Sequence, residues 1–106
     1  MNRYIINGAA QDVTQGKHIL LVAKHDLLEN TFHQIVEHIP EKEIHVKRLT
    51  KYKELVTTHQ GGTLRLARHP AAIRGAQPDT VIYWSNPKFQ NDMLTLMKTP
   101  TEIIRT

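Results

Sequence analysis

The chain of 106 residues contains no cysteine, and it contains no apolar run that approaches the length of a membrane span. The first absence excludes disulfide bonds and thiol nucleophiles, and it is compatible with a reducing compartment. The second excludes a bilayer-crossing helix, which needs about 20 consecutive apolar residues. No basic segment followed by an apolar one opens the chain, as it would in a secretory signal. We therefore expect a cytoplasmic protein that has no membrane partner.

Catalytic motifs are also missing. The single serine, Ser85, lacks the G-x-S-x-G context of a hydrolase nucleophile. Asp79 precedes an apolar segment, whereas the active sites of open α/β sheets lie at the carboxyl ends of strands. Glu29, His33 and Glu37 are spaced four residues apart and could face one cation, but this spacing is also ordinary on a solvated helix. We predict no catalytic residue, no metal ligand and no cofactor, and hence no enzymatic activity.

What the sequence does contain is a clear strand followed by a helix, between Lys17 and Ile39. Residues 18–23 are mostly apolar without alternation, which is typical of a strand covered on both faces in a parallel sheet. A helix is predicted over residues 27–39, because Asp26 and Glu29 can form a capping box and Pro40 ends the pattern. Its core-facing stripe has helical periodicity and consists of Leu28, Phe32, Ile35, Val36 and Ile39.

The rest of the chain also mixes strand and helix patterns. Residues 55–59 and 63–67 flank a pair of glycines and predict a hairpin, with a helix over residues 51–58 as the competing interpretation of the first arm. Other predicted elements are a strand over residues 3–7, a helix over 9–15 that ends at Gly16, strands over 44–49 and 80–84, short helices after Pro70 and Asn86, the second carrying Phe89 to Met97, and an edge strand or frayed tail over 101–106.

These elements predict a single domain over residues 1–106, of the α/β class. We expect a mainly parallel three-layer sheet of about four or five strands, with helices on both faces and a hairpin at one edge.

Positive charge is concentrated in the middle of the chain, although the net charge is only +4. The segment 44–74 holds seven basic residues and one acid, Glu54, whereas the remainder has more acids than bases. Such asymmetry indicates an anionic partner, either the phosphate backbone of nucleic acid or an acidic protein surface, and the alternative is a basic face that only aids solubility. The predicted nucleic-acid-binding residues are Lys47, Arg48, Lys51, Lys53, Arg65, Arg68 and Arg74.

Two short segments resemble a known family. The first segment is Gly16-Lys17 followed by an apolar strand. The second is Arg74-Gly75 followed by a polar turn and the apolar residues 80–84. They resemble parts of the nucleotide-binding core of phage terminase large subunits and related helicase-type P-loop ATPases. A P-loop requires G-x-x-x-x-G-K-[ST], but here Gly8 is too distant and His18 replaces the hydroxyl residue. The resemblance therefore implies a scaffold that has lost ATP hydrolysis, since Ser85 and Asn86 also stand where magnesium-binding acids are expected.

Two functional hypotheses follow. The first is a non-catalytic nucleic-acid-binding accessory protein of phage origin, which contacts phosphates without reading bases. The second is a protein-interaction module, either a homo-oligomer or an adaptor that docks on a host or phage protein.

Overall fold

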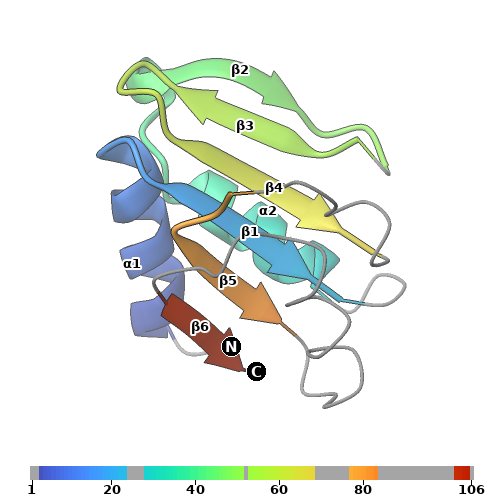
Figure 1. Ribbon diagram of the computed structural model, residues 1–106. Coiled ribbons are helices and arrows are strands. Elements are labelled where there is room, and N and C mark those ends of the chain that lie inside the picture. Colours follow the sequence, from blue (N-terminus) through green and yellow to red (C-terminus); the bar gives the residue numbers. More distant parts are fainter. Residues whose placement is uncertain (1–2, 24–27, 52, 69–76, 84–101, 106) are drawn as a thin grey trace.

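The computed structural model describes residues 3–23, 28–51, 53–68, 77–83 and 102–105. In these residues one six-stranded sheet is packed against two α-helices (Figure 1). The elements in chain order are α1 (Arg3–Thr14), β1 (His18–Val22), α2 (Glu29–Glu37), the 3-10 helix η1 (Glu41–Glu43), β2 (Ile44–Arg48), β3 (Leu55–Thr58), β4 (Thr63–Ala67), β5 (Thr80–Tyr83) and β6 (Glu102–Arg105).

The sheet is mixed, with the strand order β2-β3-β4-β1-β5-β6. Strands β4, β1, β5 and β6 pair in parallel, and β3 pairs antiparallel with both β2 and β4. The fold is therefore α/β, as predicted, but β2, β3 and β4 form an antiparallel meander beside a parallel half. The predicted hairpin is present as β3 and β4, although β2 rather than the hairpin forms the edge of the sheet.

The three-layer arrangement is not confirmed. Within the described residues both helices lie on the same face of the sheet, behind it in Figure 1, and they contact each other as well as β1, β3 and β4. We call this face the helix side and the opposite one the distal face. Trp84 and the helices predicted after Pro70 and Asn86 lie outside the described residues, as does the capping residue Asp26. No helix in the described part of the chain is long and apolar enough to cross a bilayer.

Strand β1 is central and is buried on both faces. Ile19 and Leu21 pack on the helix side, whereas Leu20 and Val22 point to the distal face, and none of the four is more than 3% exposed. The prediction of a doubly covered strand from its unbroken apolar sequence is confirmed.

Helix α2 presents the predicted stripe to the core. Leu28, Phe32, Ile35, Val36 and Ile39 are all at most 5% exposed, and they join one apolar cluster with β1, β3 and β4. The helix begins at Glu29, two residues later than predicted, and Leu28 precedes it without a side-chain cap.

The predicted strand over residues 3–7 is wrong, because these residues begin helix α1. The apolar triplet 4–6 fits a strand locally, but Ile6, Ala9, Ala10 and Val13 follow the helical spacing and are all buried against the sheet. The end of the helix was predicted correctly. Gly16 has φ +100°, and the amides of Gly16 and Lys17 donate to the carbonyls of Val13 and Asp12, which is a Schellman cap.

The turn between β3 and β4 contains two glycines with different roles. Gly61 adopts φ +88°, which favours glycine. Gly62 packs against the end of α1, where an added Cβ would lie 1.9 Å from the carbonyl oxygen of Val13. The Thr58 hydroxyl donates to the same oxygen at 2.8 Å. The competing prediction of a helix over residues 51–58 is wrong, because this tight contact with α1 and the pairing with β4 hold residues 55–58 extended.

Candidate nucleic-acid interface

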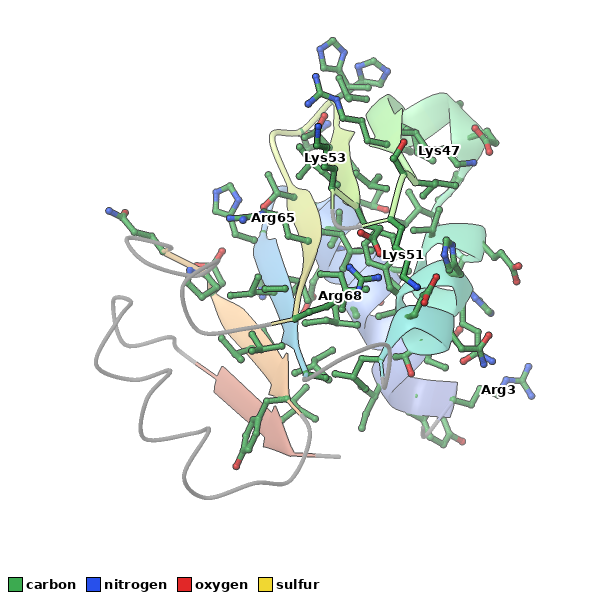
Figure 2. All side chains as sticks on the ribbon, turned by 90° about the vertical axis from the view of Figure 1, so that its right-hand side faces the viewer. Arg3, Lys47, Lys51, Lys53, Arg65 and Arg68 are labelled. Atoms are coloured by element: carbon green, nitrogen blue, oxygen red, sulfur yellow. The ribbon has the colours of Figure 1, made fainter. Side chains whose placement is uncertain are left out.

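The sheet separates the basic residues of the segment 44–74 onto its two faces. Lys47 and Arg48 are consecutive on β2, so their side chains point to opposite sides. Figure 2 shows Lys47, Lys51 and Arg68 on the side of the helices and Arg65 on the distal face. The predicted binding residues therefore do not form one surface, and Arg74 lies outside the described residues.

Arg68 is buried in an ion pair. Its guanidinium donates to both carboxylate oxygens of Glu54, with an Nη1 to Oε1 distance of 3.0 Å, and the carboxylate of Glu29 on α2 lies 3.9 Å away. The side chains of Arg68 and Glu54 are only 5% and 1% exposed. A charge that is desolvated and paired in this way holds α2 and the meander together, and it does not reach a phosphate in solvent.

Lys47 is also paired on the helix side, although at the surface. Its Nζ lies 2.9 Å from Oε1 of Glu41 in η1. Lys51 is exposed, and in Figure 2 it lies on the same side, near α2.

Among the described residues of the segment, the other two arginines lie in one row on the distal face. Arg48 on β2 is paired in register with Leu55 on β3, and Leu55 is paired with Arg65 on β4. Paired residues share a face, so the two arginines lie on the distal face with Cα atoms about 10 Å apart, twice the usual strand spacing. We call Arg48, Leu55 and Arg65 the arginine row. Both arginines are exposed, as is Lys53, which lies two residues before Leu55.

No acid opposes this charge from the same strands. Strands β2, β3 and β4 contain no Asp or Glu, and they also contain no Phe, Tyr or Trp. Their distal surface is thus cationic and offers none of these three side chains for base stacking.

A second row lies beside the first, toward the amino end of β4. Thr63 pairs in register with Thr57 on β3 and with His18 on β1. Nδ1 of His18 lies 2.8 Å from Oγ1 of Thr63. The amide of His18 donates to Oδ2 of Asp79 at 2.8 Å, and the amide of Asp79 donates back to the carbonyl of His18 at 2.8 Å. The beginning of β1 is therefore tied to the residue that precedes β5.

These residues border a cavity on the distal face. It has a volume of about 270 Å³, and its lining comprises His18, Ile19, Leu20, Thr63, Arg65, Gln77 and Pro78. Arg65 therefore belongs both to the arginine row and to the cavity. Sequence reasoning did not single out His18, Thr63 or Gln77, because only the register of β1 with β4 brings them together.

Comparison with known proteins gave no relative. No protein-family model matches the chain, no curated protein matches it, and no solved structure matches it.

Proposed function

We propose that the chain is a non-catalytic accessory protein that binds nucleic acid through its phosphates, on a scaffold similar to the core of phage terminase ATPases. The arginine row is the observation that carries the proposal. It places the exposed Arg48 and Arg65 on one face of three adjacent strands that contain no acid. Arginine contacts to phosphates supply affinity and orientation without sequence information.

The proposal narrows the set of binding residues. Arg48, Lys53 and Arg65 stay in it, because their side chains are exposed at or beside the row. Arg68 leaves it, because its charge is buried against Glu54. The absence of Phe, Tyr and Trp from β2, β3 and β4 supports contact with the backbone rather than recognition of bases.

A pair of double variants tests the proposal at equal net charge. Arg48→Gln with Arg65→Gln removes two charges from the distal face, and Arg3→Gln with Lys47→Gln removes two from the helix side (Figure 2). Binding of a labelled single strand is titrated over a series of salt concentrations. We expect the distal-face variant to make the negative slope of log K against log salt shallower by about 1.4, which is 0.7 per lost phosphate contact.

The helix-side variant should leave that slope unchanged. If both variants weaken binding equally, net charge alone attracts the nucleic acid and the arginine row has no special role. If the unmodified protein does not bind a single strand or a duplex even at low salt, the proposed function is wrong.

A further inference from the structure

The cavity beside the arginine row brings together side chains of the kind that hold a phosphate group. Arg65 supplies a permanent positive charge at one wall. Thr63 contributes a hydroxyl, and Gln77 contributes amide N–H groups. The ring of His18 lies beside this hydroxyl and orients it, because a neutral ring that donates through Nδ1 has only an acceptor left at Nε2.

The contact between His18 and Thr63 orients these donors. Nδ1 of His18 and Oγ1 of Thr63 are 2.8 Å apart, so one of them donates to the other. When Nδ1 donates to Oγ1, the hydroxyl proton of Thr63 is left to point at a ligand. A bound anion would favour this arrangement, because it needs donors and cannot donate itself.

No Asp or Glu is among the described residues that line the cavity. Oδ2 of Asp79 accepts the backbone amide of His18 at 2.8 Å, and Asp79 is not among the residues that line the cavity. Leu20 and Pro78 add apolar lining.

The size of the cavity restricts what it accepts. Its volume of about 270 Å³ lies just below the range of about 300 to 1,000 Å³ that is usual for ligand pockets. A volume of this size has room for one phosphate with its sugar. Because Arg65 also belongs to the arginine row, a strand lying along that row could end in the cavity.

We propose that this cavity binds the terminal phosphate monoester of a nucleic-acid strand, with Arg65, Thr63 and Gln77 as its contacts and with His18 as the residue that orients the Thr63 hydroxyl. This inference rests on the proposed function, since it assigns the end of the strand that the arginine row holds. It places the bound phosphate at the amino ends of β1 and β4, on the distal face.

The test compares one short single-stranded oligonucleotide in three forms, with a 5′-phosphate, with a 3′-phosphate and with hydroxyl groups at both ends. We expect one of the two terminal phosphates to tighten binding by about tenfold at constant salt, as charge-assisted hydrogen bonds to one group would. Thr63→Val should abolish this gain while it leaves the affinity for the hydroxyl-ended strand nearly unchanged.

The chain offers a matched control for this variant. Thr57 is paired with Thr63 in the same row, lies outside the cavity, and its buried hydroxyl has no hydrogen-bond partner among the described residues. Thr57→Val should therefore keep the full gain from the terminal phosphate. Equal loss in both variants would mean that the effect is structural, and it would overturn the assignment of Thr63.

A second measurement separates this inference from the proposed function. Phenyl phosphate is titrated while the backbone amide signals of Thr63 and Arg65 are followed by NMR. If oligonucleotides bind but no terminal phosphate tightens the complex, the cavity assignment is wrong and the proposed function stands. If phenyl phosphate shifts both signals but no oligonucleotide binds, the cavity holds a phosphate from another source and nucleic-acid binding is wrong. If neither probe binds, both proposals fail.

Discussion

The basic residues of the segment 44–74 have different surroundings on the two faces of the sheet. On the helix side, Arg68 is buried against Glu54, and Lys47 is paired with Glu41. On the distal face, Arg48 and Arg65 are exposed on strands that contain no acid. The difference follows from strand alternation, which sends neighbouring residues to opposite faces. A cluster of positive charge in a sequence therefore does not define a surface until the strands are placed.

The largest expected effect comes from breaking the buried pair on the helix side. Arg68→Met removes the guanidinium that pairs with Glu54, whose side chain is only 1% exposed. We expect the free energy of unfolding to fall by about 3 to 5 kcal/mol, because an unpaired buried charge is costly. Urea denaturation followed by circular dichroism measures this loss.

The double variant Glu54→Leu with Arg68→Met shows whether the loss reflects the unpaired charge. It removes both charges and keeps apolar volume, so most of the stability should return. If the double variant is as unstable as Arg68→Met, shape rather than charge makes Arg68 necessary, and the contrast between the two faces is weaker than we state.

Truncating one leucine on each face of the β3–β4 hairpin should destabilise the protein by different amounts. Leu64 on β4 points to the helix side and is 0% exposed, whereas Leu55 on β3 lies in the arginine row and is only half-buried. We expect Leu64→Ala to lower the free energy of unfolding by about 2 to 5 kcal/mol. Leu55→Ala should cost clearly less, since part of its surface is already in water. Thermal and urea unfolding of both variants test this order, and equal losses would mean that the distal face is packed as closely as the helix side.

The smallest effect concerns the exposed pair on the helix side. Lys47→Gln removes the contact with Glu41, whose side chain is 79% exposed. We expect a loss of only about 0.2 to 1 kcal/mol, the range for surface ion pairs, and this loss should shrink further in high salt. A change of several kcal/mol in urea unfolding would show that Lys47 stabilises the fold more than its position indicates.

Much of the fold could be predicted from the sequence where one pattern dominates. Three predictions of this kind are confirmed: the buried strand from the unbroken apolar run in β1, the core-facing stripe of α2, and the hairpin from the glycines between β3 and β4. The beginning of helix α1 was wrongly predicted as a strand, because Tyr4, Ile5 and Ile6 suit a strand as well as a helix. The small residues Ala9 and Ala10 give a weak apolar signal, so the helical spacing became clear only from their burial against the sheet.

The candidate site was harder to predict than the fold. Arg68 pairs with Glu54 across 14 positions, from just after β4 to just before β3, and the sequence around Arg68 does not distinguish it from Arg65. The cavity depends on the register between β1 and β4, which places His18 beside Thr63 across 45 positions. Local periodicity predicts which residues alternate within a strand, but it does not predict which strands become neighbours.

The topology of the sheet also bears on the order in which it forms. Strands β2, β3 and β4 follow one another in sequence and pair as neighbours, so the meander closes only short loops. Strand β1 meets β4 across 45 positions, and the bond between His18 and Asp79 spans 61. Local contacts form faster than distant ones, so we expect the amides of β3 and β4 to be protected before those of β5 in pulse-labelled hydrogen exchange. The arginine row would then exist during folding before the cavity beside it is complete.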